Sequence, residues 1–190
     1  MKQITIKIEF FSPWNCSSGL SAGSDADSLV IKTPDNLPYI PGRTVKGLIR
    51  NAIEDYISLS GKNFPIDEMF GKGTETDNDE DMPKMGHLFF SDATLAHNEA
   101  QSIIAGRLSD FLYQNRTSTA IDSKSGIAKD HSLRTIEVTV PCTLYATVLN
   151  VDDNLIAIMQ QALGLIKNIG TGRNRGMGRC RFSIEGGGEA

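Results

Sequence analysis

The spacing of apolar residues changes its period along this chain, and this change restricts the fold more than any other feature of the sequence. Over residues 4–10, ITIKIEF, apolar and polar side chains alternate, which is the pattern of a β-strand with one buried face. From Thr44 onward the apolar residues recur every three or four positions, which indicates an amphipathic helix after the Pro41-Gly42 turn. The apolar residues of this helix are Val45, Leu48, Ile49, Ala52, Ile53, Tyr56 and Ile57. The chain therefore begins with a strand and continues into a helix.

The same two periods return further along the chain. Residues 86–95, GHLFFSDATL, are short, aromatic and bounded by turn formers, which predicts a second strand. Residues 134–148, RTIEVTVPCTLYATV, alternate over a long third strand, in which Pro141 predicts an edge or a bulge. A second helix is predicted from the apolar residues Leu155, Ile158, Met159, Ala162, Leu163 and Ile166. A last strand is predicted from Cys180, Phe182 and Ile184.

The resulting order, strand, helix, strand, strand, helix, strand, predicts an α+β fold. Two βαβ halves of this kind form a ferredoxin-like (RRM-like) antiparallel sheet with both helices on one face. With 190 residues, 39% of them hydrophobic, the chain is long enough for one such core, so we expect a single domain over residues 1–190. Because this fold carries many functions, the fold alone does not identify one.

Composition excludes several classes of protein. No apolar stretch approaches the roughly 18 residues of a membrane span, and no apolar run follows the basic start, so we expect a cytoplasmic protein without a membrane partner. The three cysteines are odd in number and widely spaced, so neither a disulfide framework nor a zinc cluster is expected. His87, His97 and His131 are far apart in the sequence and do not predict a metal site.

Charge is distributed unevenly along the chain, whose net charge is −4. Five acids lie in an insertion at about residues 71–85, which we expect to be a solvated loop: Glu75, Asp77, Asp79, Glu80 and Asp81. No acid lies between Asn154 and Ile184, a segment that contains Lys167, Arg173, Arg175, Arg179 and Arg181. Because the local sign of charge governs binding, this segment can attract a polyanion although the whole chain is acidic.

A glycine-rich loop lies inside the basic segment, at residues 168–182, NIGTGRNRGMGRCRF. Its glycines are Gly170, Gly172, Gly176 and Gly178. Their spacing fits neither the dinucleotide-binding fingerprint nor the P-loop, and those motifs run from strand to helix whereas this loop runs from helix to strand. A flexible backbone beside Arg173 and Arg175 suits close approach to phosphates. The alternative is a glycine-rich turn with solvated arginines.

A second basic group lies at the start of the first predicted helix. Arg43, Lys46 and Arg50 are three and four residues apart, so they share one helix face. Cations in a first helical turn oppose the helix dipole, and a bound phosphate chain would remove that conflict. The alternative is an ordinary solvated helix face.

Several blocks resemble a known family. The segment IGTGRNRGMGRCRF, between the last helix and the last strand, resembles the glycine-rich loop of the RAMP superfamily of CRISPR-associated proteins. The block LVIKTPDNLPYIPGRTVKGLIRNAIED resembles the segment that leads into the first helix of the guide-RNA backbone subunits of type III CRISPR effector complexes. FG, HLFFSDATL and TSTAIDSKSGIAKDHSLRTIEV resemble the next landmarks in order. The resemblance covers nearly the whole chain.

This resemblance implies an RNA-binding subunit of an antiviral complex. Such subunits stack head to tail along a guide (CRISPR) RNA beside other subunits, and a complementary target RNA pairs with the guide. A thumb hairpin interrupts the guide, and here it would span about residues 113–135. Its candidate RNA contacts are Arg116, Lys124, Lys129 and Arg134 for phosphates, and Ile121 and Ile127 for bases. The alternative is a mobile solvent loop.

The resemblance also implies a catalytic residue. In cleaving members an aspartate follows the first strand, and the matching stretch SAGSDADSLVIK places it at Asp27, with Asp25 as the alternative. An aspartate can help to place a divalent cation (Mg²⁺ or Mn²⁺) or to activate the 2′-hydroxyl that attacks the adjacent phosphate, which makes the chain a candidate metal-dependent endonuclease. The alternative is an Asx-turn in a loop rich in Gly and Ser.

Three other functions stay open at this stage. The chain could be a structural RNA-binding subunit of the same complex without cleavage activity. It could be a guide-processing endoribonuclease, for which His131 is the candidate base. It could also be a small phosphate- or nucleotide-binding domain that uses the glycine-rich loop without RNA.

Overall fold

The computed structural model describes residues 1–21, 26–72 and 84–186, and it contains an antiparallel β-sheet and four α-helices among them. In chain order the elements are β1 (Lys2–Phe10), α1 (Gly42–Ser60), α2 (Ile66–Phe70), β2 (Gly71–Lys72), β3 (Lys84–Met85), β4 (Phe89–Phe90), α3 (His97–Ala105), β5 (Tyr113–Ser118), β6 (Arg134–Thr139), β7 (Thr143–Val151), α4 (Asp153–Ala162) and β8 (Cys180–Glu185). Short 3-10 turns occur at Ser109–Leu112, Leu163–Leu165 and Arg173–Arg175. The acidic segment that the sequence singles out lies largely outside the described residues.

The central sheet has four strands in the order β4-β7-β1-β8, and each neighbouring pair is antiparallel. Its centre is β1, whose Ile4, Ile6 and Ile8 point to the same face and are fully buried. The strand predicted over 86–95 is shorter, because β4 comprises only Phe89–Phe90, whereas Thr94 forms an isolated bridge to Tyr145 of β7 and Ala93 one to Ile40. The alternation in ITIKIEF thus produces the buried face of the sheet.

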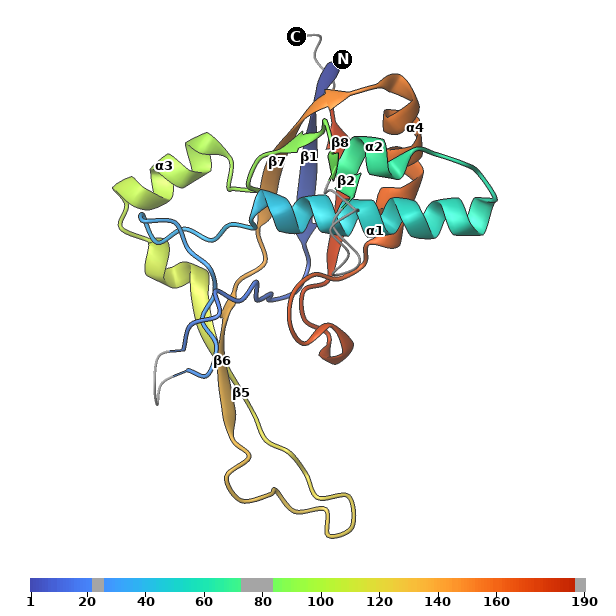
Figure 1. Cartoon of the computed structure of the whole chain (residues 1–190). Coiled ribbons are helices and arrows are strands. Elements are labelled where there is room, and N and C mark those ends of the chain that lie inside the picture. Colours follow the sequence, from blue (N-terminus) through green and yellow to red (C-terminus); the bar gives the residue numbers. More distant parts are fainter. Residues whose placement is uncertain (22–25, 73–83, 187–190) are drawn as a thin grey trace.

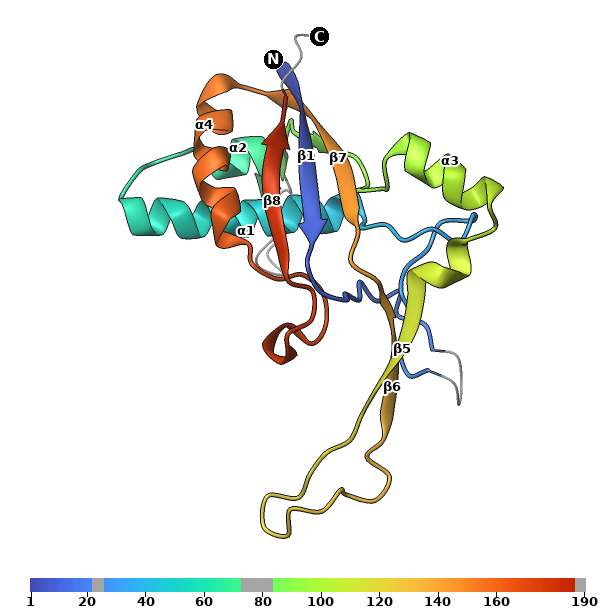
Figure 2. The same ribbon diagram turned by 180° about the vertical axis from the view of Figure 1, so that it is seen from behind.

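Helices α1 and α4 cover this buried face together (Figures 1 and 2). The predicted apolar residues Val45, Ile49 and Ile53 of α1 are fully buried against the sheet. At the start of α4, the N–H of Leu155 donates a hydrogen bond to the Asp152 carboxylate at 2.7 Å, which caps the helix. Helix α1 ends at Ser60 and is capped by Gly61, whose φ of 67° is the left-handed conformation that favours glycine.

The predicted strand 134–148 is two strands that belong to different sheets. β7 lies in the central sheet, whereas β6 pairs with β5 in an antiparallel hairpin that projects from the body (Figures 1 and 2). The break falls at residues 140–142, where Pro141 has no N–H to donate to a strand partner. We refer to residues 113–139 as the β5–β6 hairpin; it includes the stretch 113–135 in which the sequence predicts a thumb.

Helices α2 and α3 were not predicted from the sequence. Helix α2 has five residues, too few for a visible period, and α3 has no buried residue, so its apolar pattern is weak. All three cysteines are free, and burial raises the pKa of Cys142 and of Cys180 to about 12. None of the helices in the described part of the chain is long and apolar enough to span a membrane.

Candidate nucleic-acid interface

Asn15, in the segment that follows β1, bonds both to the glycine-rich loop and to β6 at the base of the β5–β6 hairpin. Its side chain is fully buried, and its Nδ2 donates a hydrogen bond to the Glu137 carbonyl in β6 at 2.7 Å. On the other side, Thr171 of the glycine-rich loop donates from Oγ1 to Asn15 Oδ1 and from its N–H to the Asn15 carbonyl, both at 3.1 Å. Asn15 therefore holds the glycine-rich loop and the hairpin in a fixed relation.

The neighbouring Trp14 anchors the same junction in the core. Its ring is fully buried and stacks on Phe10, with centroids 4.4 Å apart. Its backbone exchanges hydrogen bonds with Thr139 at the end of β6, at 3.0 and 2.7 Å. Sequence reasoning missed Trp14 and Asn15, because two residues in a loop carry no periodic signal.

The glycine-rich loop is itself a hairpin whose geometry requires glycine. Its four glycines, Gly170, Gly172, Gly176 and Gly178, have positive φ angles of 85°, 72°, 78° and 65°. A Cβ at Gly170 would collide with the carbonyl oxygen of Asn15, and one at Gly178 with the carbonyl oxygen of Ile169. The loop thus packs backbone against backbone at its base, while its tip at Arg173–Arg175 is exposed.

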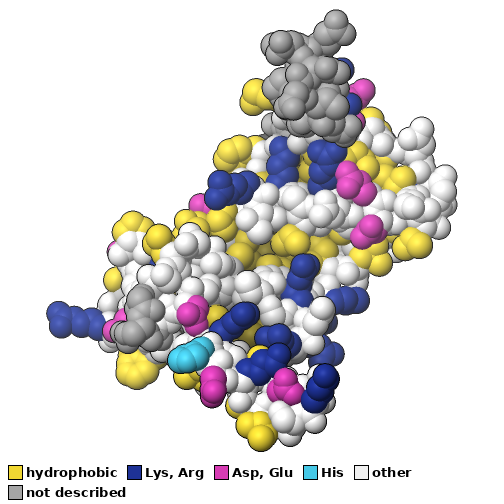
Figure 3. Space-filling model, turned by 60° about the horizontal axis from the view of Figure 1, so that its bottom comes forward, with side chains coloured by type: hydrophobic (Ala, Val, Ile, Leu, Met, Phe, Trp, Pro, Cys, Tyr) yellow, Lys and Arg dark blue, Asp and Glu magenta, His cyan; other side chains and the backbone are white. Residues whose placement is uncertain are grey.

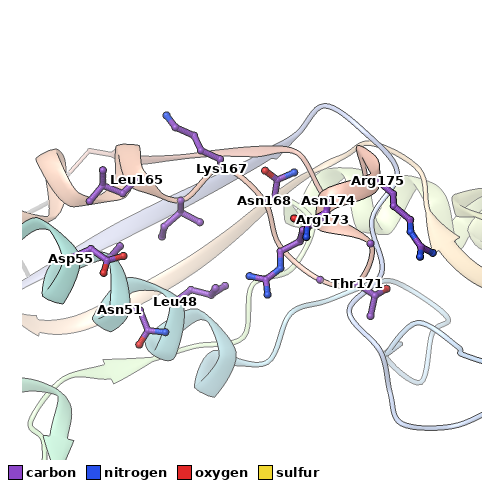
Figure 4. A pocket seen from close by; sticks show the side chains of 14 residues that line it. Leu48, Asn51, Asp55, Leu165, Lys167, Asn168, Thr171, Arg173, Asn174 and Arg175 are labelled. Carbon is purple, nitrogen blue, oxygen red and sulfur yellow. The ribbon is translucent and has the colours of Figure 1, made fainter.

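An open groove of about 870 Å³ separates this loop from α1 (Figure 4). Helix α1 contributes Leu48, Asn51 and Asp55 to its walls; the other wall is formed by residues 165–167 and by residues 168 and 170–175 of the loop. Arg173 points from the loop toward α1, whereas Arg175 points away from α1 (Figure 4). Arg173 and Arg175, which the sequence predicts to contact phosphates, therefore face different surroundings.

The cations predicted on α1 differ in their partners. Arg43 is exposed. Burial and the neighbouring Arg50 lower the pKa of Lys46. The guanidinium of Arg50 donates to Glu54 at 2.8 Å, to Asp67 at 2.8 Å and to the Gly71 carbonyl at 2.6 Å, so it holds α2 and β2 against α1.

The N-terminus of α1 also has a protein partner. The N–H of Gly42 donates to the carboxylate of Asp92 at 2.7 Å. A negative charge is therefore already present where the sequence predicts that a phosphate offsets the helix dipole. A phosphate bound there would have to share this end of the helix with Asp92.

Asp27 lies beside the first residues of β6. Its Oδ2 accepts a hydrogen bond from the N–H of Thr135 at 2.8 Å, and its own N–H donates to the Thr135 carbonyl at 2.7 Å. The Asp27 side chain is exposed, and its Oδ1 accepts no hydrogen bond from residues that the structure describes. Asp25, the alternative candidate, lies outside the described residues.

Glu137 of β6 fastens the loop that carries Asp27. Its carboxylate, in a side chain only 13% exposed, accepts a hydrogen bond from the N–H of Val30 at 3.0 Å and pairs with Lys32 Nζ at 2.8 Å. The same Nζ lies 3.8 Å from the centre of the Tyr113 ring in β5. Burial, followed by the charge of Glu137, raises the pKa of the Tyr113 hydroxyl, which donates to the Asn36 carbonyl.

A family profile for the RAMP superfamily matches residues 7–181. The chain belongs to the RAMP superfamily. Among solved structures, a chain from the cryo-EM structure of the type III-B Cmr-beta bound to cognate target RNA has a TM-score of 0.70 with 11% sequence identity, and the match covers 97% of both chains. At that identity the likeness shows the fold. No curated protein sequence matches this chain.

In this RAMP superfamily member, the far end of the β5–β6 hairpin contrasts with its base. The predicted contact residues, of which Arg116 and Arg134 lie in the paired strands and the rest beyond them, are exposed: Arg116, Ile121, Lys124, Ile127, Lys129 and Arg134. The carboxylate of Asp122 accepts hydrogen bonds from the N–H groups of Lys124 and Ser125, and these bonds lower the pKa of Asp122. His131 lies in the same end with a φ of 55°. Within the described ranges, no three His, Cys, Asp or Glu residues are grouped so as to hold a metal ion.

Proposed function

We propose that this chain is an RNA-binding subunit of a type III CRISPR effector complex, which binds the guide RNA at the junction of the glycine-rich loop and the β5–β6 hairpin. One observation carries the proposal: buried Asn15 and nearly buried Glu137 hold the glycine-rich loop, the hairpin base and the Asp27 loop together. Membership of the RAMP superfamily and the fold shared with a Cmr-beta chain support it.

The charge and shape of this face support RNA as the ligand. Lys and Arg side chains gather in groups on the face seen in Figure 3, while Asp and Glu side chains are scattered singly. Arg116, Arg134, Arg173 and Arg175 are exposed and form no ion pair with residues 1–21, 26–72 or 84–186. Ile121 and Ile127 are 66% and 69% exposed, so each offers an apolar surface to bases. Free cations beside exposed apolar groups suit single-stranded RNA.

We also propose a ferredoxin-like core. Helix α1 lies between β1 and β4 in the chain, and α4 lies between β7 and β8. With the strand order β4-β7-β1-β8, this connectivity corresponds to two split βαβ units.

Asp27 is the proposed catalytic residue for cleavage of complementary target RNA. Its Oδ2 accepts a hydrogen bond from the N–H of Thr135, so the carboxylate has a defined direction, while its Oδ1 accepts none from residues 1–21, 26–72 or 84–186. Mg²⁺ is commonly held by one or two carboxylates together with phosphate oxygens of the substrate, and Asp27 fits that arrangement. A cation there would stabilise negative charge on the phosphate while the 2′-hydroxyl loses its proton to a base or water, its oxygen bonds to phosphorus, and the bond to the 5′-oxygen of the next nucleotide breaks, so that this oxygen leaves and takes up a proton. The protein would contribute mainly alignment of the 2′-oxygen with the phosphorus.

The test is cleavage of a labelled single-stranded RNA by the protein assembled on a complementary guide, with and without Mg²⁺. We expect regularly spaced, metal-dependent cuts that Asp27→Ala abolishes and that Asp35→Ala, at an exposed aspartate in a nearby loop, leaves intact. Guide binding without cuts by the wild-type protein would contradict the catalytic role and leave the binding role. Absence of guide binding would contradict both.

A second candidate is a purely structural RNA-binding subunit. The observation that favours it is the pair of hydrogen bonds between Asp27 and Thr135, which gives this aspartate a role in joining its loop to the hairpin. In that case Asp27→Ala lowers stability and leaves every RNA activity of the folded protein unchanged.

A further inference from the structure

A small pocket joins the glycine-rich loop to the side of the β5–β6 hairpin. Its volume is about 130 Å³. It is lined by Ser118, Thr119, Ala120, Ser132, Arg134 and Arg175. Pockets that enclose whole small-molecule ligands usually measure about 300–1,000 Å³, so this one suits a single chemical group rather than a nucleotide.

The described residues that line the pocket give it a positive charge. Arg134 comes from the hairpin and Arg175 from the glycine-rich loop, and no carboxylate of the residues that the structure describes lines the space between them. Neither guanidinium forms an ion pair within the described part of the chain. Two like charges that share a small pocket repel each other, and an anion between them would turn this repulsion into two attractions.

The hydroxyl side of the pocket is already organised. Ser132 Oγ lies 2.7 Å from Thr119 Oγ1, accepts the N–H of Ala120 at 3.1 Å and donates to the Lys129 carbonyl at 2.6 Å. These bonds join the two arms of the hairpin just beyond the paired strands. An anion therefore enters a pocket whose wall is held in place before binding, which lowers the entropy cost of ordering that wall.

We infer that this pocket binds one phosphodiester group of the RNA, with Arg134 and Arg175 on opposite sides of the phosphate. The inference rests on the proposed function and adds to it, because it assigns both arginines to one shared phosphate rather than to separate ones. A phosphodiester has two non-bridging oxygens, so each guanidinium has its own acceptor. The bound phosphate thereby links the glycine-rich loop to the hairpin.

The test is the salt dependence of binding to a fluorescent oligouridine, measured for the full chain and for Arg134→Gln, Arg175→Gln and the double variant. For single strands, the slope of log K against log salt changes by about 0.7 for each phosphate that is neutralised. We expect each single variant to keep nearly the wild-type slope, because the other arginine still neutralises the phosphate. The double variant should lose about 0.7.

Arg173→Gln is the matched control, since Arg173 lies in the same loop and points toward α1. Because Arg173 does not line the pocket, Arg173→Gln should change the slope of log K against log salt by the same amount whether or not Arg134→Gln is also present. All the substituted arginines are exposed, and circular dichroism of each variant checks that it remains folded.

The outcomes separate the inference from the proposed function. Losses of about 0.7 in each single variant and about 1.4 in the double variant would mean two separate phosphates and would overturn the shared site. An unchanged slope in the double variant would mean that the pocket holds no phosphate. If the wild-type chain binds no oligouridine at all, the proposed function fails and this inference fails with it.

Discussion

The base and the far end of the β5–β6 hairpin belong to one structural element, yet their side chains are held in opposite ways. At the base, Thr139 is fully buried and Glu137 is 13% exposed, and both are tied to loops more than 100 residues away in the sequence. At the far end, Ile121, Ile127 and Leu133 are 66–70% exposed. The base can therefore place groups with precision, and the far end keeps its apolar groups available to a partner.

The largest expected effect tests how closely the junction at the base is packed. Gly170→Ala should lower the free energy of unfolding by about 2–4 kcal/mol, because the new Cβ meets the Asn15 carbonyl and φ is positive. Gly126→Ala, at the far end, has a similar φ of 71° and open space around its Cβ, so about 1 kcal/mol is expected. Urea denaturation measures both. Equal effects would mean that the junction is no better packed than the far end.

The next effect concerns the carboxylate that fastens the Asp27 loop. Glu137→Ala leaves the Val30 N–H and the Lys32 ammonium without their acceptor, so we expect the free energy of unfolding to fall by about 2–3 kcal/mol. Asp122→Ala removes a carboxylate with comparable hydrogen bonds at the exposed end and should leave global stability unchanged. If both variants had the same denaturant midpoint, the base would contribute no more to stability than the far end, and the contrast between them would be wrong.

A smaller effect is expected at the far end, in binding rather than in stability. Ile127→Ser should leave the denaturation midpoint unchanged and weaken guide RNA binding about fivefold, since an apolar contact of about 1 kcal/mol is lost. Leu59→Ser is the control, because Leu59 is 80% exposed and lies at the C-terminal end of α1, outside the hairpin. Equal loss of RNA affinity in both variants would argue against a specific role of the hairpin.

The smallest effect is expected in the rate at which a thiol reagent modifies Cys142, at the base of the hairpin. The pKa of Cys142, next to β6, is about 12 because the thiol is buried, so little reactive thiolate exists at pH 8. In a variant with Cys16 and Cys180 replaced by serine, modification of Cys142 should accelerate about tenfold per pH unit below its pKa. Bound RNA should slow it by holding the base closed. Fast labelling whose rate levels off above about pH 8.5, as for an exposed thiol, would show that the base opens freely.

Sequence patterns predicted those parts of the fold whose residues act through local periodicity. The alternation in β1 and the three-and-four spacing in α1 correspond to buried faces. The prediction of one strand over residues 134–148 with an edge or bulge at Pro141 was wrong, because β6 and β7 belong to different sheets. Helix α3 was missed because none of its residues is buried. Local rules therefore identified the core and missed an element that packs at the periphery.

The junction could not be predicted in the same way, because its contacts join distant residues. Asn15 bonds to Glu137, 122 positions away, and to Thr171, 156 positions away. No local pattern of apolar or charged residues around any of the three predicts these contacts. Only the folded chain reveals that the glycine-rich loop, the hairpin and the Asp27 loop share one base.

The break between β6 and β7 makes the hairpin a direct continuation of the core. Only residues 140–142 separate β6 from β7, which lies next to the central strand β1, whereas β5 is attached through the 3-10 turn Ser109–Leu112 to the exposed helix α3. One arm of the hairpin is thus rooted in the sheet and the other in the periphery. When a partner displaces the far end of the hairpin, we therefore expect the force to act on the sheet through β6, and we expect β5 to move before β6 does.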